Sequence, residues 1–338
     1  MNILIIRLSS MGDVILATSV FSYLKRELPV SKIWFVTQEK YAELFSYDTR
    51  LARVVPVQKG AEKAAARELA GVEWNRIIDL QNSPKSRMLR KGLLSRQPAA
   101  AFQKLHGRRL ALLWAGINLY RHGDHVVARY AKAAGFSKRD GAPFPSAGII
   151  LDKKKCEAVR KSASGSAMVR PMIALFPFSA WKNKEWPTAN YAFVGRYFSI
   201  KGWGVMIAGG PQDVAAAEAL KRRIGGQCLS TAGALSLYET ACLVSICKLA
   251  LGNDTGLCHL ARACGVKTGV IYGPTTAHFG FFPYGDPPFR VFEARHFCRP
   301  CHAHGGNICY TGSRRCMTKI RPEMVIKGLE ELHNDGKS

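Results

Sequence analysis

The sequence lacks several features that would assign it to other classes of protein. No apolar run approaches the roughly 18 residues that a membrane-spanning helix needs. The first 20 residues are apolar, but Arg7 and Asp13 interrupt them and no basic segment precedes them, so we expect no signal peptide. Without an export signal, the ten cysteines are expected to be reduced thiols.

Acidic residues are scarce in two parts of the chain. Lys and Arg total 49 against 24 Asp and Glu, a formal net charge of +25. Between Pro84 and Lys132 stand eleven basic residues and one acid, and from Arg295 to Arg321 stand six basic residues and no acid. This clustering predicts an anionic partner: nucleic acid, an acidic substrate or an anionic membrane surface. No helix-turn-helix or RNP pattern is present, which disfavours nucleic acid.

The amino terminus also lacks the G-x-G-x-x-G pattern of dinucleotide-binding domains. An apolar run at 2–6 predicts a strand, Arg-Leu-Ser-Ser-Met-Gly-Asp follows at 7–13, and a helix is predicted over 13–28. Asp13 at the helix start is typical of an N-cap. A carboxylate in such a loop, if the loop faces a cleft, is also suited to act as a general base.

A second strand-to-helix junction lies late in the chain. A strand predicted at 248–251 runs into Asn-Asp-Thr-Gly-Leu-Cys-His at 253–259, and a helix is predicted over 257–264. Asp254 or Thr255 would cap that helix. Its first N–H groups, with Thr255, Gly256 and His259 around them, would form a phosphate site. An ordinary turn with a good N-cap is the alternative.

Predicted strands and helices alternate along the whole chain, with the candidate linker between two βα series. The first half has strands at 2–6, 32–37, 53–57, 76–80 and 98–102, and helices at 13–28, 38–46, 61–70, 84–94 and 124–134. The second half has helices at 153–163, 188–199, 212–224, 237–246, 257–264 and 322–332, and strands at 172–176, 204–208, 248–251 and 268–272. This alternation predicts two parallel sheets flanked by helices, and 338 residues suit two domains.

Three motifs together resemble glycosyltransferase family 9, the ADP-heptose:lipopolysaccharide heptosyltransferases. They are the 7–13 motif, Lys-Glu-Trp-Pro at 184–187, and the 253–259 motif with Gly-Pro-Thr at 273–275. The resemblance implies an α/β GT-B architecture, in which two Rossmann-like parallel-sheet domains face a cleft. We expect an acceptor-binding domain at 1–155, a linker at 156–170, a nucleotide-sugar-binding domain at 171–321 and a helix at 322–338 that packs back on the first domain.

The same resemblance implies roles for single residues. Asp13 would be the general base, and Lys184, two positions before Trp-Pro, would neutralise the leaving pyrophosphate. Donor-binding candidates are Ser179, Lys184, Glu239, Asp254, Thr255, Gly256, Leu257 and His259. Acceptor-binding candidates are Ser10, Gly12, Arg108 and Arg109. Ala180 departs from a frequent Ser or Thr, so one phosphate contact is missing or comes from Lys182, and register leaves Tyr238 as an alternative to Glu239.

The resemblance implies an inverting, metal-independent enzyme without a cofactor. It would transfer heptose from ADP-heptose to the anionic inner core of lipopolysaccharide. We expect a monomer that binds no nucleic acid. We expect it to be cytoplasmic and peripherally bound at the inner face of the inner membrane. The alternatives are transfer of another nucleotide sugar to a different anionic glycan, a nucleic-acid-binding protein, and an epimerase or binding module on similar domains.

Four cysteines near the carboxyl end form the last notable pattern: Cys298, Cys301, Cys309 and Cys316. With His302 and His304 between them, they could supply soft ligands to Zn²⁺ or an iron–sulfur cluster. The spacing is not a clean pair of C-x2-C knuckles, which argues against metal. We expect reduced thiols packed around the cleft, with a nucleic-acid-binding protein carrying a metal site as the alternative.

Overall fold

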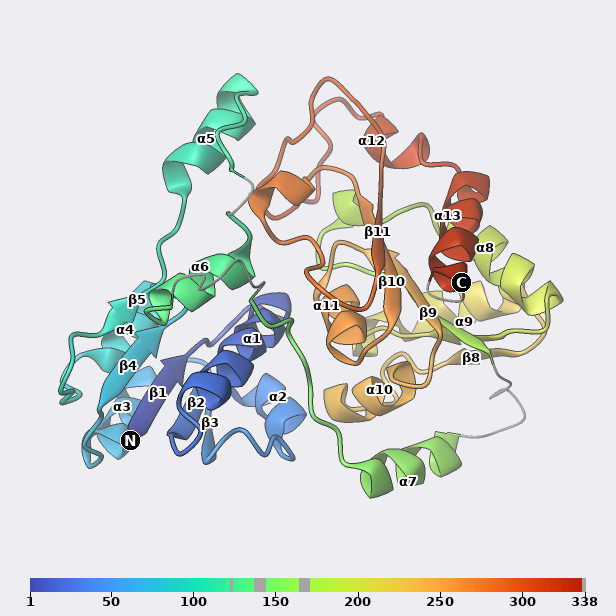
Figure 1. The fold of residues 1–338 in the computed structure, drawn as a ribbon. Coiled ribbons are helices and arrows are strands. Elements are labelled where there is room, and N and C mark those ends of the chain that lie inside the picture. The colour runs from blue at the N-terminus through green and yellow to red at the C-terminus, as the bar shows by residue number, and fades with distance from the viewer. Residues whose placement is uncertain (122–123, 137–143, 164–170, 336–338) are drawn as a thin grey trace. The chain divides into compact units, whose positions relative to one another are not determined.

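The structure, a computed structural model, describes residues 1–121, 124–136, 144–163 and 171–335 (Figure 1). The chain divides into two compact units. The first unit comprises Met1–His106 and Arg121–Leu151, and the second comprises Gly107–Tyr120 and Asp152–Ser338. Compared with the expected boundary at 155, the second unit therefore starts earlier and also takes residues 107–120. Of the expected linker, 164–170 lies outside the described residues.

The first unit contains a five-stranded sheet. Its strands are β1 (Asn2–Ile6), β2 (Lys32–Gln38), β3 (Arg53–Val57), β4 (Arg76–Asp79) and β5 (Ala100–Ala101). Its helices are α1 (Met11–Glu27), α2 (Glu39–Ala42), α3 (Glu62–Ala70), α4 (Pro84–Arg90) and α6 (Val126–Ala133), with a 3-10 turn at Glu43–Phe45. The order β3-β2-β1-β4-β5, with parallel pairing throughout, is that of a Rossmann-like sheet.

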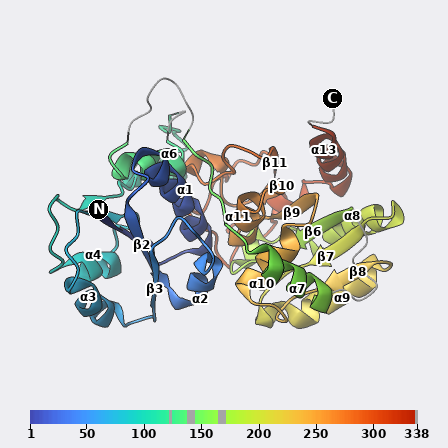
Figure 2. The ribbon, with the colours of Figure 1, turned by 60° about the horizontal axis from the view of Figure 1, so that its bottom comes forward.

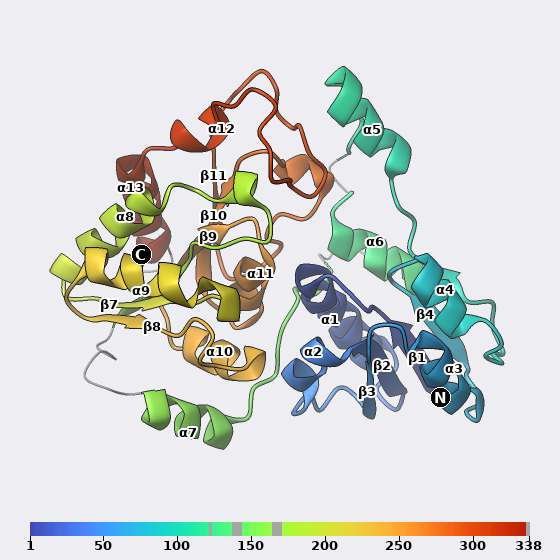
Figure 3. The same ribbon diagram turned by 180° about the vertical axis from the view of Figure 1, so that it is seen from behind.

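Helices cover this sheet because its strands are apolar on both sides, as parallel strands usually are. Helices α3 and α4 lie next to each other beside this sheet (Figure 3). Leu4, Ile6 and Val36 form one core cluster with Leu69 of α3 and Leu89 of α4. On α1, the ring of Phe21 packs edge-on at 4.8 Å from Phe35 of β2. The predicted helix at 84–94 ends at Arg90, and the predicted strand at 98–102 is reduced to two residues.

The second unit contains a six-stranded sheet. Its strands are β6 (Met172–Phe176), β7 (Gly204–Ile207), β8 (Cys228–Ser230), β9 (Leu249–Asn253), β10 (Lys267–Tyr272) and β11 (Phe289–Glu293). Its helices are α5 (His106–Ala115, apart from His106), α7 (Lys153–Ala163), α8 (Thr188–Ile200), α9 (Val214–Ile224), α10 (Leu237–Val244), α11 (Gly256–Ala263), α12 (Arg315–Thr318) and α13 (Pro322–Asn334), and 3-10 turns lie at Lys182–Lys184, Pro211–Asp213 and Ala277–Phe279. The order β11-β10-β9-β6-β7-β8 is again that of a Rossmann-like sheet, so the prediction of two parallel sheets is confirmed.

Side chains on the two faces of these strands belong to two separate core clusters. Helices α8, α9, α10, α11 and α13 surround the strands of this sheet (Figure 2). Ile173 and Leu175 of β6 pack with α8, α9 and α13, whereas Met172, Ala174 and Phe176 pack with α10 and α11. Residues on opposite faces of a strand alternate with a period of two, which accounts for this division. The sequence did not predict α5, α12, β8 or β11, which are short or weakly patterned.

The carboxyl-terminal helix corrects one expectation. We expected 322–338 to pack back on the first domain, but Val325, Ile326 and Leu329 of α13 are buried in the core of the second unit, against α8, β10 and β11. The expectation followed from the resemblance, and the apolar stripe of the helix alone does not specify which sheet it covers. Residues 336–338 lie outside the described part.

The expectation of ten reduced cysteines is also wrong at one pair. Cys156 of α7 and Cys242 of α10 form a disulfide across 86 residues of sequence. The two helices pack together, which brings the two side chains within bonding distance. Eight cysteines remain free among the described residues. In the part of the chain that the structure describes, every helix is too short or too polar to cross a membrane.

The packing of α13 can be tested at Gly269 in β10. A Cβ atom there would lie 2.8 Å from Cε2 of Phe292 and 3.0 Å from Cδ2 of Leu329. Gly269→Ala should therefore lower the free energy of unfolding by about 1–3 kcal/mol in urea titrations. The matched control is Gly107→Ala in α5, where a Cβ meets nothing within 4 Å. Equal stability of wild type and Gly269→Ala would contradict this packing.

Candidate active site

Both sheets reverse their strand order at one point, and the predicted motifs lie at these points. The reversal falls between β1 and β4 in the first unit and between β6 and β9 in the second. Ligands of open α/β sheets bind beyond the carboxyl ends of the strands at such reversals. The 7–13 motif follows β1, the 184–187 motif lies in the loop after β6, and Asp254 follows β9. Each unit thus presents its own candidate site.

In the first unit, Asp13 is held by groups from two segments, the loop after β1 and helix α6. Its Oδ2 accepts hydrogen bonds from the Ser10 hydroxyl at 2.7 Å and the Ser10 N–H at 3.3 Å, and it pairs with Nη2 of Arg7 at 2.8 Å. The phenol of Tyr130, on α6, donates to Oδ1 at 3.2 Å. Burial raises the pKa of Tyr130 far above its ordinary value, so the phenol stays a donor. We expected Asp13 to be the N-cap, but the N-cap is Ser10, and Asp13 stands three residues later in the first turn of α1, where its carboxylate accepts from the Ser10 N–H. Asp13 remains an oriented carboxylate.

The loop that carries Asp13 is fixed by the end of β4. Arg7 also donates to the carbonyl of Leu80 at 2.6 Å, and Oε1 of Gln81 accepts from the N–H groups of Leu8 and Ser9. The fully buried Asp79 accepts two backbone hydrogen bonds in the turn that follows β4. The neighbouring strand thus sets the position of the carboxylate, a long-range effect that sequence reasoning did not detect.

In the second unit, Lys184 and Asp254 form an ion pair. Nζ of Lys184 lies 2.6 Å from Oδ2 of Asp254, and the side chains are only 10% and 15% exposed. The hydroxyl of Thr275 donates to the same oxygen at 2.9 Å. Burial alone would raise the pKa of Asp254, but Lys184 and the two hydrogen bonds together hold it below its ordinary value. The site therefore contains a formed charge pair.

This pairing corrects the role expected for Asp254. We expected Asp254 or Thr255 to cap α11, but Thr255 occupies the N-cap position and makes no side-chain cap hydrogen bond. The carboxylate of Asp254 points to Lys184 instead, because a cation 70 residues away competes better than neutral N–H groups. The Thr255 hydroxyl is buried and has no partner among the described residues.

The start of α11 has no side-chain cap from its N-cap residue. Gly256 is its first residue, and the helix runs for eight residues. The first N–H groups of a helix have no partner within the helix, and their dipoles favour a negative charge. His259 adds to this field, since it is among the groups that lower the pKa of Asp254. Leu257 lies half-buried in the same turn.

The amide of Asn253 joins the two loops that form the site. Its Oδ1 accepts from the N–H of Trp186 at 3.0 Å and from the Tyr191 hydroxyl at 3.1 Å. Its Nδ2 donates to the carbonyl of Pro177 at 2.9 Å. Asn253 is fully buried at the end of β9, so it fixes the 177–187 loop relative to Asp254. The motif contained this residue, but no role was predicted for it.

Two other donor candidates have structural roles of their own. The hydroxyl of Ser179 accepts from the N–H of Trp181 at 3.2 Å, within the loop that carries Lys184. Glu239 accepts from the N–H of Ser236 at 2.8 Å and completes the capping box of α10. Lys182 is exposed and pairs with Glu185. The contacts of Glu239 thus account for its position without a ligand, and its role in donor binding stays a prediction.

The four acceptor candidates do not share one unit. Ser10 is exposed beside Asp13, and Gly12 is buried in the first turn of α1. Arg108 and Arg109 lie on α5, which belongs to the second unit. The expectation that both arginines belong to the first domain is therefore wrong. The two arginines were placed in the first domain because they precede residue 155 in the sequence. Residues 107–120, however, belong to the second unit.

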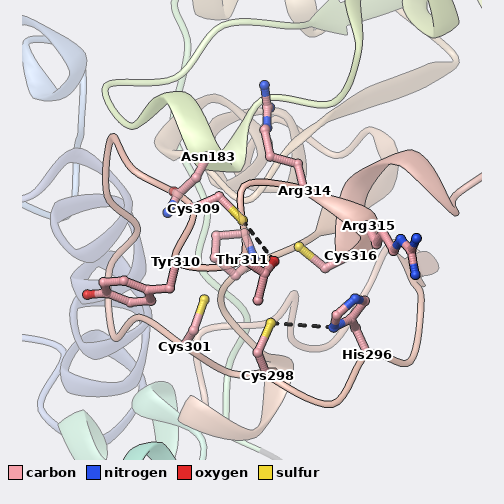
Figure 4. A pocket seen from close by; sticks show the side chains of 11 residues that line it. Asn183, His296, Cys298, Cys301, Cys309, Tyr310, Thr311, Arg314, Arg315 and Cys316 are labelled. Atoms are coloured by element: carbon pink, nitrogen blue, oxygen red, sulfur yellow. Dashed lines mark hydrogen bonds between the residues drawn. The ribbon is translucent and has the colours of Figure 1, made fainter.

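The four carboxyl-terminal cysteines line one small pocket, with Asn183 and Arg314 at its edge (Figure 4). Cys298 contacts His296 at 3.4 Å, and Cys309 contacts the Thr311 hydroxyl at 3.4 Å. Burial raises the pKa of Cys301 to about 12, so that thiol stays protonated. Among the described residues, no group of three or more His, Cys, Asp or Glu is arranged to hold a metal ion.

The residues between Cys301 and Cys309 pack against Lys184. Asn183 accepts from the N–H of Gly306 at 2.8 Å, and its own N–H donates to the Gly306 carbonyl at 3.0 Å. Gly305 has φ +102°, and a Cβ there would lie 2.6 Å from Cδ of Lys184. Only glycine fits this position, because both the backbone conformation and the contact exclude a side chain. The cysteine-containing segment thus confines the lysine that the motif predicted.

Comparison with known proteins decides the family. The model of glycosyltransferase family 9 (heptosyltransferase) matches residues 63–303 of the 338. The chain belongs to glycosyltransferase family 9. It is 26% identical to lipopolysaccharide heptosyltransferase 1 of Pseudomonas aeruginosa over 98% of both chains. The expected family is therefore confirmed.

Solved structures agree on the fold of this family 9 member. The glycosyl transferase family 9 structure from Veillonella parvula matches with a TM-score of 0.78 and 21% identity, over 99% of this chain and 97% of that one. The E. coli ADP-heptose lipopolysaccharide heptosyltransferase II matches with a TM-score of 0.77 and 20% identity, over 100% of both. The fold is GT-B, as predicted.

The ion pair in this family 9 protein can be tested by a double-variant cycle. Asp254→Asn should lower the free energy of unfolding by about 3–5 kcal/mol, because it leaves the buried ammonium of Lys184 unpaired. Adding Lys184→Met should recover most of that loss, since neither charge then remains. Urea unfolding of the four proteins measures the coupling. Additive effects would show that the two side chains do not interact.

Acidification of the same proteins gives an independent test. The pKa of Asp254 is lowered in the folded state, so its stabilising contribution is complete above the ordinary carboxyl pKa of about 3.9 and is lost as pH falls through the lowered value. Below that ordinary value, wild type should lose stability more steeply than Asp254→Asn/Lys184→Met. Parallel pH profiles of the two proteins would contradict the assignment.

Proposed function

We propose that this chain is an inverting glycosyltransferase that transfers heptose from ADP-heptose to the anionic inner core of lipopolysaccharide. Family membership supports glycosyl transfer. The similar proteins from P. aeruginosa and E. coli carry lipopolysaccharide heptosyltransferase names, and the E. coli one is named for ADP-heptose. The observation that carries the proposal is the convergence of Lys184, Asp254 and the start of α11 at one strand-order reversal.

The donor diphosphate would bind at that reversal. An ammonium group has three donors, so Lys184 can keep its bond to Asp254 and still donate to a phosphate. The first N–H groups of α11 and the unpartnered hydroxyl of Thr255 would supply further donors. The charge on the diphosphate grows as the sugar leaves, and these fixed dipoles stabilise it in the transition state.

The acceptor hydroxyl would be activated by Asp13. The partners named above hold this carboxylate in one orientation while leaving it 15% exposed. In a single displacement, the acceptor oxygen forms a bond to the anomeric carbon, the bond to the diphosphate breaks, and Asp13 takes the hydroxyl proton. One displacement inverts the anomeric configuration and needs no covalent enzyme intermediate.

The proposal assigns charge neutralisation to protein groups, so transfer should continue in the presence of a chelator. The protein would act as a monomer at the inner face of the membrane that carries the acceptor. A direct test incubates the protein with ADP-heptose, GDP-, UDP- or ADP-hexoses, with and without inner-core acceptor, and weighs the acceptor by mass spectrometry. Acceptor-dependent gain of one heptose from ADP-heptose is expected. Transfer from another nucleotide sugar alone would overturn the donor assignment.

Replacement of the proposed base should remove turnover and leave donor binding intact. Asp13→Asn should lower kcat by about 10²–10⁴-fold, because the amide cannot accept the proton. The matched control is Glu27→Gln at the other end of α1, where the carboxylate pairs only with the exposed Arg26 among the ion pairs described. Initial rates with saturating donor provide the measurement. Near-normal kcat in Asp13→Asn would place the base elsewhere.

Removal of the donor-side cation should weaken ADP binding. The Asp254→Asn/Lys184→Met variant is suited to this test because its fold should be retained. Loss of a charge-assisted hydrogen bond of about 1.5–3 kcal/mol raises the Kd for ADP by about 10–100-fold. Lys182→Ala is the control, since that exposed lysine already pairs with Glu185. Titration calorimetry giving unchanged affinity in the double variant would move the donor away from this site.

A further inference from the structure

Helix α5 and the residues after it expose an unusual amount of apolar surface. Of the ten residues in α5, only Leu112 is buried. Trp114 is 86% exposed, and Leu110, Ile117 and Leu119 are each more than half exposed. Positions two apart on a helix point about 200° apart, and positions four apart share a face. Leu110 and Trp114 therefore stand together, opposite the buried Leu112.

The residues that follow α5, 116–120, are held in place by hydrogen bonds and a ring contact. Gly116 has φ +68°, and the N–H of Ile117 donates to the carbonyl of Ala111 at 3.1 Å, so the chain turns back at the end of α5. Oδ1 of Asn118 accepts from the N–H of Tyr120 at 3.0 Å. The ring of Tyr120 packs edge-on against Phe279 of the same unit. These bonds fix Ile117 and Leu119 in exposed positions beside the helix.

The sequence on both sides of these apolar residues contains charge of one sign. From Leu80 to Gly123 the sequence contains nine Lys or Arg and no Asp or Glu. Arg108 and Arg109 lie on α5 itself, and the guanidinium of Arg109 lies 3.4 Å from Nε2 of His304. His304 belongs to the second acid-free stretch, from Arg295 to Arg321. Arg108 and Arg109 thus accompany the apolar face on α5, and Arg109 contacts a second segment that contains no acid.

We propose that α5 and residues 116–119 form a membrane-binding element that inserts Trp114, Ile117 and Leu119 into an anionic lipid surface. Exposed Trp and Leu beside arginines are the composition of helices that lie in a bilayer interface. The arginines attract anionic headgroups, and the apolar side chains enter the acyl boundary. This inference rests on the proposed function, because binding to the membrane would bring the enzyme to a lipid-anchored acceptor.

Flotation of the full chain with vesicles tests the element without donor or acceptor. Wild type should float with vesicles of phosphatidylglycerol and phosphatidylethanolamine and much less with phosphatidylcholine alone. Trp114→Ser/Leu119→Ser should lower the partition coefficient by at least about tenfold, the effect of removing one buried apolar side chain. Ile200→Ser is the matched control, because Ile200 ends α8 of the same unit and is 77% exposed. It should float like wild type.

A second measurement locates the tryptophan. Lipids brominated in their acyl chains should quench wild-type fluorescence more strongly than that of Trp114→Phe, which should still float. Equal flotation of wild type and Trp114→Ser/Leu119→Ser would overturn the proposal. So would self-association of wild type that the double variant abolishes while lipid binding stays unchanged, because the face would then bind a second copy.

The outcomes separate this inference from the proposed function. Heptose transfer to a deacylated, water-soluble acceptor should be unchanged in Trp114→Ser/Leu119→Ser, while transfer to the acceptor in vesicles should fall with the partition coefficient. Absence of transfer to any acceptor, with flotation still dependent on Trp114 and Leu119, would refute the function and support the membrane element. Normal transfer in vesicles by a variant with unchanged flotation would refute the element alone.

Discussion

The side-chain amide of Asn253 is the constraint on which the second unit's site depends. It fills both of its hydrogen-bonding roles inside the protein, with Pro177, Trp186 and Tyr191 as partners. These bonds join the ends of β6 and β9, the two strands between which the sheet order reverses. An unsatisfied buried amide costs free energy, so the loop after β6 has one favoured path. That path brings Lys184 to Asp254.

The Lys184–Asp254 pair then sets the electrostatics of the site. Two partly buried charges 2.6 Å apart nearly cancel at long range, so the site does not hold a bare cation that would bind any anion. A diphosphate at the start of α11 would meet the ammonium, the helix dipole and the Thr255 hydroxyl together. Binding would therefore depend on several donors at fixed positions, and this dependence favours a ligand with two phosphates over a single charge.

The sequence predicted the regular parts of the fold and the location of the site, and it failed where partners lie far apart. Apolar runs bounded by turns predicted β1, β6 and β9 because parallel strands are buried on both faces. Asp254 was interpreted as a helix cap because an Asp before a helix usually is one, and a lysine 70 residues away leaves no local signal. The disulfide between Cys156 and Cys242 and the sheet that α13 covers are likewise set by tertiary packing. Helix α5 is short, and its apolar residues are mostly exposed, so the usual stripe of a core-facing helix is absent.

Each proposed catalytic group is oriented by its own unit. The partners described for Asp13, which are Arg7, Ser10 and Tyr130, belong to the first unit, and those for Lys184 belong to the second. Any carboxylate is a far weaker base than an alkoxide, so taking the proton from a neutral alcohol is unfavourable. Asp13 would therefore not deprotonate an alcohol before the reaction begins. The proton would instead move to Asp13 as the acceptor oxygen bonds to the anomeric carbon and becomes more acidic, which is the regime in which a well-placed weak base is effective.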